Sequence, residues 1–265
     1  MSAPSWEHVG FQEPAAGLAV LTIDRPPVNA LGAALVRDLN AACAHLESVP
    51  PERMPRAVIL AAQGKCFSAG ADLKERQAMS AEQVRAWVPR LSGTFTRIAS
   101  LPMPTIAVVA GVAAGGGVEL ALACDLRVAE EQATLGLRET ALAIIPGAGG
   151  TQRLPRLIGP ARAKRWIFTA RMHTAAEALA DGAVDLVAPA GRGMEAALDM
   201  ARLVLANGPV AVRLAKRAVD GGAGLPMPEA LDHERRCYEG TLATDDRLEA
   251  LKAFLEKRDP VYKGR

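Results

Sequence analysis

Two glutamates in the sequence lie in stretches that are otherwise almost wholly apolar. Glu119 interrupts the apolar run from Val118 to Cys124, and Glu139 stands before the apolar segment 141–145. Because burying an ionised carboxylate is costly or raises its pKa, each glutamate needs an internal partner or a chemical role. Two carboxylates around one water can act as general base and general acid. The pair is too far apart for one helix, so the two can meet only if the chain reverses between them.

Three glycine-rich stretches could bring backbone N–H groups to a ligand. They are SAGAD (68–72), GVAAGGG (111–117) and IPGAGGTQ (145–152), and none of them contains GxGxxG or GxxxxGK[ST]. Dinucleotide and Walker-type phosphate sites therefore lose their best support. Two strand–glycine loop–helix units that converge would instead form an oxyanion hole, because glycine permits close backbone approach. Tight turns and close packing remain the alternative explanation for each loop taken singly.

The elements that must position these residues follow an alternating pattern. Short apolar runs rich in β-branched residues predict buried strands, at 18–23, 57–62, 105–110, 126–129 and 184–188. Helical periodicity lies between several of them, over 30–46 and over 80–99, where Ser80 and Gln83 form a capping-box pattern. Strands alternating with helices indicate an α/β core.

The pattern changes near Gly193, after which strand signals stop. Amphipathic helices are expected from Gly193 to about Asn207, from Pro209 to the DGGAG segment, over 228–240 and over 245–258. We therefore divide the chain into an α/β core, 1–192, and a helical segment, 193–265. That segment is too small to hold its own core, so its apolar faces are expected to pack on the core or on another subunit.

Composition and charge exclude several classes of function. The net charge is +2 and aromatic residues make up 4% of the 265, which gives no general attraction to nucleic acid or acidic membranes. Four scattered cysteines without a CxxC pair fit free thiols in a reducing compartment, and four histidines lack metal-ligand spacing. Neither a signal peptide nor a membrane-spanning stretch is evident, so we expect a soluble cytoplasmic protein.

Several ordered motifs carry a resemblance to a known family. CFSAGADLKE (66–75), GVAAGGGVELALACDLRVA (111–129) and LAIIPGAGGTQRLPRLIG (142–159) resemble the enoyl-CoA hydratase/isomerase, or crotonase, family. The likeness extends from LTIDRPPVNAL (21–31) to ATDDRLEALKAFLEKR (243–258). It implies a spiral of ββα units, C-terminal helices that form trimers, and commonly a hexamer of two trimers.

The resemblance also implies a site that binds acyl-CoA thioesters. The N–H groups of Ala71 and Gly116 would hold the thioester oxygen. Glu119 would activate a water that adds to C3, and Glu139 would deliver a proton to C2 on the same face. Coenzyme A arrives as part of the substrate, so neither a separate cofactor nor a metal is expected.

Further residues are expected, from the same resemblance, to contact coenzyme A. Asp72 is expected to act mainly by fixing its loop through local hydrogen bonds, and Tyr238 and Lys257 could come from a neighbouring subunit. The full set of expected contacts is Arg25, Ala69, Asp72, Leu73, Lys74, Tyr238 and Lys257.

The reaction and substrate leave alternatives open. Two glutamates favour a hydratase over an isomerase, which generally keeps one. The motifs look most like the branch that hydrates 3-methylglutaconyl-CoA in leucine breakdown, with straight short-chain enoyl-CoA as the alternative. A substrate with a distal carboxylate would need a positively charged side chain facing its acyl group, such as Arg76 or Arg85. Some relatives bind RNA through a lysine-rich helix, but here the helix over 30–46 has only Arg37, so RNA binding is not expected.

Overall fold

The chain is built on two sheets in the computed structural model, which describes residues 4 and 6–265. The larger sheet has six strands, in which β1 is antiparallel to β2 and the other neighbours run parallel. In spatial order its strands are β1 (Val9–Ala15), β2 (Leu18–Ile23), β3 (Ala57–Ala62), β5 (Thr105–Val109), β7 (Leu126–Glu130) and β10 (Leu186–Ala188).

The smaller sheet consists of short strands, and three of them, β4, β6 and β8, each continue from a strand of the larger one. β4, β6 and β8 run parallel, and β9 lies antiparallel to β8. Along the chain β3 leads to β4, β5 to β6 and β7 to β8, each pair followed by helix, which is the spiral of ββα units expected from the resemblance. The strands of this sheet are β4 (Cys66–Ser68), β6 (Val112–Ala114), β8 (Thr134–Gly136) and β9 (His173–Thr174).

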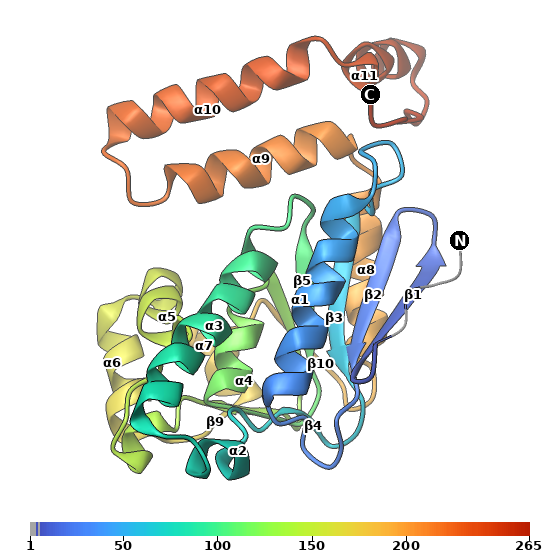
Figure 1. The fold of residues 1–265 in the computed structure, drawn as a ribbon. Helices are drawn as coiled ribbons and strands as arrows, with labels where there is room; N and C mark the ends of the chain where they lie inside the picture. The colour runs from blue at the N-terminus through green and yellow to red at the C-terminus, as the bar shows by residue number, and fades with distance from the viewer. Residues whose placement is uncertain (1–3, 5) are drawn as a thin grey trace.

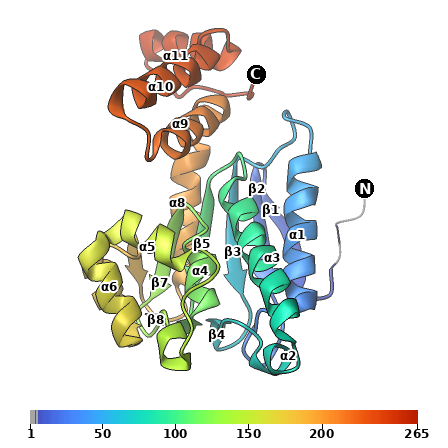
Figure 2. The same ribbon diagram turned by 60° about the vertical axis from the view of Figure 1, so that its left-hand side comes forward.

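Helices cover both faces of the larger sheet (Figures 1 and 2). Strand side chains alternate between the faces, so Leu21 and Leu60 belong to the cluster beneath α1 and α3. Val20 and Ile59 point the other way, into the cluster with α8. The core helices are α1 (Ala33–Ser48), α2 (Leu73–Gln77), α3 (Ala81–Ala99), α4 (Gly116–Ala121), η1 (a 3₁₀ helix, Glu139–Leu142), α5 (Gly150–Ile158), α6 (Pro160–Thr169), α7 (Ala175–Asp181) and α8 (Gly193–Leu205).

The five predicted strands are confirmed as β2, β3, β5, β7 and β10, with small differences at their ends. The capping box that opens α3 is confirmed as well. Ser80 Oγ accepts from Gln83 N at 3.2 Å, and Gln83 Oε1 accepts from Ser80 N at 2.8 Å.

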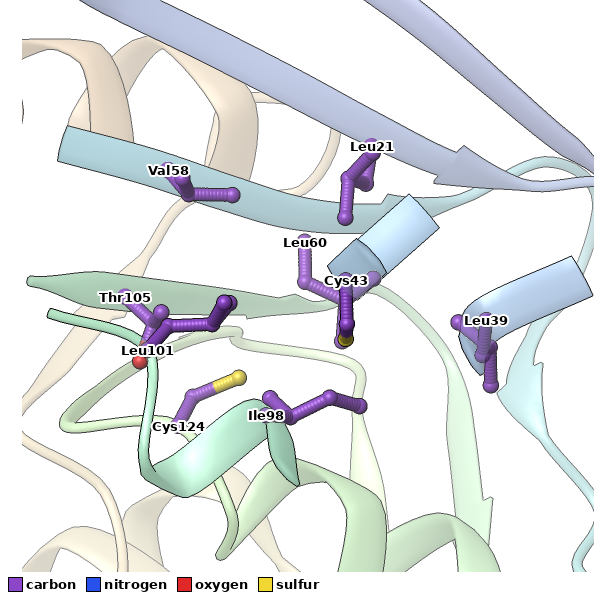
Figure 3. Close-up of a pocket in the computed structure, with 9 residues that line it drawn as sticks. All are labelled: Leu21, Leu39, Cys43, Val58, Leu60, Ile98, Leu101, Thr105 and Cys124. Atoms are coloured by element: carbon purple, nitrogen blue, oxygen red, sulfur yellow. The ribbon is translucent and has the colours of Figure 1, made fainter. Parts of the chain in front are cut away.

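The core beneath α1 and α3 contains one small void, shown in Figure 3. Its volume of about 10 Å³ is at most that of a single water, so it is a packing defect and no substrate pocket. Two cysteines, Cys43 and Cys124, point into it. Burial raises the pKa of both thiols to about 12, which keeps them protonated and unreactive.

The C-terminal helices divide into one that packs on the sheet and three that leave it. α8 packs against β3, β5 and β7, whereas α9 (Pro209–Gly222), α10 (Met227–Leu242) and α11 (Asp245–Glu256) stand above the core in Figures 1 and 2. An ion pair between Lys216 and Asp125 ties α9 to the core. The division of the chain after residue 192 stays a prediction. Among residues 4 and 6–265, no helix has the length and apolar character needed to cross a bilayer.

Candidate functional site

Glu119 and Glu139 converge at the beginning of α4. Glu119 lies on the buried first turn of α4 and is 2% exposed, while Glu139 opens η1 and is 9% exposed. The Glu139 carboxyl lies against Gly115, the residue before α4, where an added Cβ would stand 2.9 Å from Glu139 Oε1. Gly115 has φ 52°, a conformation that also favours glycine. The chain reversal through β7 and β8 thus brings together two carboxylates that are distant in sequence.

Backbone amides from a third segment hold Glu119. Its Oε1 accepts hydrogen bonds of 2.8 Å from the N–H groups of Ala148 and Gly150, at the start of α5. Burial raises the pKa of Glu119, while these two hydrogen bonds and the charge of Arg153 oppose that rise. The carboxylate is therefore fixed through Oε1, and no described residue donates a hydrogen bond to its Oε2.

Glu139 has a different environment, which suits it to carry a proton. Burial, reinforced by the charge of Glu119, raises the pKa of Glu139 to about 7. Its Oε2 is buried and, within the described part of the chain, has no hydrogen-bond partner. At neutral pH this residue can exchange a proton, whereas Glu119 is held as an acceptor. Two neighbouring carboxylates in such unlike environments can act as an acid and a base.

The backbone N–H groups of Ala71 and Gly116 lie near each other, beside the first turn of α4. A parallel bridge between Leu31 and Ala71 uses the carbonyl of Gly70 and the N–H of Asp72, so the N–H of Ala71 is left out of it. Gly116 is the first residue of α4. An added Cβ on Gly116 would lie 3.7 Å from Ala71 N, and one on Gly70 would lie 3.2 Å from Gly116 N.

Neither amide is used elsewhere within residues 4 and 6–265: no carbonyl or side chain there accepts from Ala71 N or Gly116 N. Two free donors this close together can bind one oxygen atom and stabilise negative charge on it. The arrangement is compatible with the oxyanion hole that the glycine-rich stretches predicted as a possibility, and that role stays a prediction. Its place beside Glu119 and Glu139 joins the separate sequence motifs into one site.

Arg25 and Asp72, both predicted to contact coenzyme A, bind each other. Arg25 Nη2 lies 2.8 Å from Asp72 Oδ2 and 3.2 Å from Glu75 Oε1, and Arg25 Nη1 donates to the carbonyl of Ala30 at 2.6 Å. Asp72 also caps α2 by accepting from the N–H groups of Lys74 and Glu75. As expected for Asp72, these contacts fix the loop that presents Ala71.

The other predicted contacts on this loop are exposed. Ala69, Leu73 and Lys74 all face solvent, and Leu73 is 59% exposed although it is apolar. They flank the Ala71 amide and can reach a ligand bound there. Arg76 lies on α2 and Arg85 on the first half of α3, and no ion pair to a described residue involves either of them.

Tyr238 and Lys257 are not brought to this site by their own chain. Tyr238 lies on α10 beside a cavity of about 560 Å³ between α9, α10 and α11, and Lys257 ends α11. Figures 1 and 2 show these helices at the opposite end of the molecule from α2 and β4. Within the described chain, Tyr238 and Lys257 therefore lie away from Ala71.

Sequence reasoning missed the apolar exposed surface beside Glu139. Leu142, Ile144 and Ile145 follow it and are 55%, 48% and 69% exposed. The apolar stretch itself was visible in the sequence, but its exposure was not. Such a surface beside the two carboxylates can receive an apolar part of a ligand.

The amides of Ala148 and Gly150 and the side chain of Arg153 were also missed. The glycine-rich stretch 145–152 gave a signal for exposed amides, but nothing local identified Glu119 as their acceptor.

Across residues 4 and 6–265, no three His, Cys, Asp or Glu side chains gather as a metal site would require.

The chain is similar to known proteins along most of its length. Residues 13–265 match the model of the enoyl-CoA hydratase/isomerase family. The mitochondrial methylglutaconyl-CoA hydratase of Homo sapiens is 46% identical over 260 residues, covering 96% of this chain and 76% of that protein. The enoyl-CoA isomerase/hydratase fer4 of Mycosarcoma maydis is 42% identical, covering 94% and 93%. A crystal structure of enoyl-CoA hydratase from Bacillus anthracis superposes with a TM-score of 0.94 at 45% identity, covering 98% of this chain and all of that one.

Proposed function

The chain belongs to the enoyl-CoA hydratase/isomerase family, and from that premise we propose that it catalyses reversible syn addition of water across the 2,3 double bond of a 2-enoyl-CoA thioester. The observation that carries this proposal is the pairing of Glu119 with Glu139 beside two unpaired amides. An isomerase moves a proton and needs no activated water, so a second carboxylate supports hydration.

In the proposed reaction the Ala71 and Gly116 amides bind the thioester oxygen. As the water oxygen adds to C3, electrons move toward the thioester oxygen. The two amides stabilise the enolate that forms. One such donor can contribute ~10²–10³ in rate because it is already oriented where charge develops. Glu119 accepts a proton from the attacking water through its free oxygen, and Glu139 delivers its proton to C2. The net result is one water added, with one proton moved from Glu139 to Glu119.

Coenzyme A enters this reaction as part of the substrate, with no separate cofactor. We assign its nearest contacts to the exposed residues Ala69, Leu73 and Lys74. Arg25 and Asp72 would support the binding of coenzyme A indirectly, by fixing the loop that carries these residues. Tyr238 and Lys257 would contact it from a neighbouring subunit of a trimer, or of a hexamer of two trimers.

The proposed acyl group is 3-methylglutaconyl, with a straight short-chain enoyl group as the alternative. The relation to the human methylglutaconyl-CoA hydratase supports the first. Arg76 and Arg85, without ion pairs to described residues, are candidates for its distal carboxylate. The four cysteines are free, which supports a reducing compartment such as the cytoplasm, although the human relative is described as mitochondrial.

The proposal is tested with purified protein and two thioesters, crotonyl-CoA and 3-methylglutaconyl-CoA. Hydration removes the conjugated enoyl-thioester absorbance, so kcat/KM is measured directly for each. We expect the wild type to hydrate both thioesters, with the higher kcat/KM for 3-methylglutaconyl-CoA. We expect Glu139→Gln to hydrate neither. A higher value for crotonyl-CoA selects the straight-chain alternative. An unchanged absorbance with both substrates contradicts the proposal.

A further inference from the structure

We propose that Arg153 is a positioning residue for Glu119: it clamps the loop whose amides hold the carboxylate, and it acts through the peptide group of Ala148. This inference rests on the proposed function for its catalytic consequence, but its geometric part concerns the free protein. Arg153 lies on α5, one turn beyond the two amides that it would support.

The peptide group of Ala148 joins Arg153 to Glu119. Its carbonyl accepts from Arg153 Nη1 at 2.9 Å, and the N–H of the same residue donates to Glu119 Oε1 at 2.8 Å. On the far side Arg153 Nη2 donates to Thr96 Oγ1 of α3 at 3.2 Å. A continuous set of contacts therefore runs from α3 to the catalytic carboxylate, and the guanidinium is its central member.

The loop sequence leaves room for this clamp. Gly149 has φ 113°, and a Cβ added there would stand 2.0 Å from Arg153 Nη1. The guanidinium thus occupies the space that any side chain at 149 would fill. A loop of this shape allows Arg153 to pass over it and reach the carbonyl of Ala148.

The charge of Arg153 acts in the same direction as the clamp. It favours the ionised form of Glu119, and Glu119 in turn opposes the lowering of the Arg153 pKa by burial. The elements packed most closely on α4 are β4, β5, β6 and α5. β5 and β6 carry no titratable side chain, β4 carries Cys66, and α5 adds Arg156, which is exposed. Glu139, from η1, is the acidic group that interacts with Glu119.

The test compares Arg153→Met and Arg153→Lys with a matched control, Arg156→Met. Arg156 lies on the same helix and, among the residues that the structure describes, donates only to Gln152, so its loss should leave the site intact. Removing the charge at 153 raises the pKa of Glu119, so the rising limb of the kcat–pH profile moves to higher pH. We expect kcat to fall by ~10²-fold with KM little changed, since misplacing a reacting group has about that effect. Arg153→Lys keeps the charge but cannot contact both the Ala148 carbonyl and Thr96 Oγ1. The rising limb of its kcat–pH profile should therefore stay near the wild-type pH, while kcat falls.

Hydrogen exchange of the backbone amides of residues 147–151 in the free protein provides a readout independent of activity. Faster exchange of the Ala148 and Gly150 amides in Arg153→Met, but not in Arg156→Met, supports the clamp. The proposal is overturned if, in Arg153→Met, these two amides exchange as in the wild type and the rising limb of the kcat–pH profile lies at the wild-type pH. If the wild type hydrates no thioester, the proposed function fails, while the exchange result still decides the role of Arg153. If Arg153→Met does not fold, Thr96→Val removes only the contact between Arg153 Nη2 and Thr96 Oγ1. Unchanged exchange of the Ala148 and Gly150 amides in Thr96→Val then counts against the proposal.

Discussion

Glu139 lies beside Glu119 in the interior, and burial together with the charge of Glu119 raises the pKa of Glu139 to about 7. Burial also raises the pKa of Glu119, but hydrogen bonds from two amides and the charge of Arg153 oppose that rise. Neighbouring carboxylates in unequal environments can hold different protonation states at one pH. This inequality underlies the first two predictions.

The hydration rate is expected to fall as the pH rises through about 7, because Glu139 must carry the proton that it delivers to C2. Glu119→Gln removes the neighbouring negative charge and should move the titration of Glu139 to lower pH. Carbon-13 NMR of labelled glutamate follows this titration without any substrate. A Glu139 carboxyl that titrates at the same pH in both proteins would show that the two groups do not interact.

Glu139→Gln should stabilise the folded protein above pH 7. The pKa is raised in the folded state, so stability is greatest below the ordinary value of 4.5 and is lost as the pH rises through about 7. The glutamine variant escapes this loss, which can amount to ~3 kcal/mol of unfolding free energy. Urea unfolding at pH 8 and pH 5, at fixed protein concentration, should show a gain that shrinks at pH 5. Glu52→Gln, at an exposed loop position, is the control; an equal gain at both pH values would contradict the assignment.

Gly116→Ala should reduce kcat by ~10²-fold or more by disturbing the amide pair. The new Cβ would stand 2.8 Å from Leu31 Cδ1 and 3.7 Å from Ala71 N, so the buried Leu31 side chain or α4 must shift. Gly93→Ala, on the exposed side of α3 with open space around its Cβ, is the matched control. It should leave kcat unchanged and raise stability by up to ~1 kcal/mol, because alanine favours the helix. Equal kcat in the two variants would remove Gly116 from the site.

The exposed apolar face of α11 should be required for assembly. Leu248, Leu251, Phe254 and Leu255 are 61%, 54%, 81% and 80% exposed, which is unusual for large apolar side chains gathered on one helix. Light scattering after size exclusion should give a trimer or hexamer for the wild type and a smaller species for the double variant Phe254→Asp, Leu255→Asp. Lys252→Glu, an exposed change on the same helix, should leave the mass unchanged. A wild-type mass for the double variant would exclude this face from the interface.

The sequence predicted the elements that depend on local signals. β3 and the capping box at the start of α3 could be identified because apolar runs and cap residues lie within a few positions of each other. The strands of the smaller sheet, three residues or fewer, were not predicted, because so few residues show no period.

Contacts between distant segments explain what the sequence left open at the site. The apolar surroundings of Glu119 marked it as unusual, but its amide partners lie about thirty positions away and became evident only in the fold. Arg25 was expected, from the resemblance, to contact coenzyme A, and its pairing with Asp72 depends on tertiary packing. Local composition could suggest donors and acceptors, but it could not pair them.

The most direct test of the central claim is a double-mutant cycle on the two carboxylates. We would measure kcat for hydration of the better of the two thioesters by the wild type, Glu119→Gln, Glu139→Gln and the double variant. If both groups act on one water, each single change should cost ~10³-fold or more, and the double variant should be little worse than either, because residues that act as a unit are not additive. A single variant within tenfold of the wild type, or fully additive losses, would contradict the claim that Glu119 and Glu139 share one water.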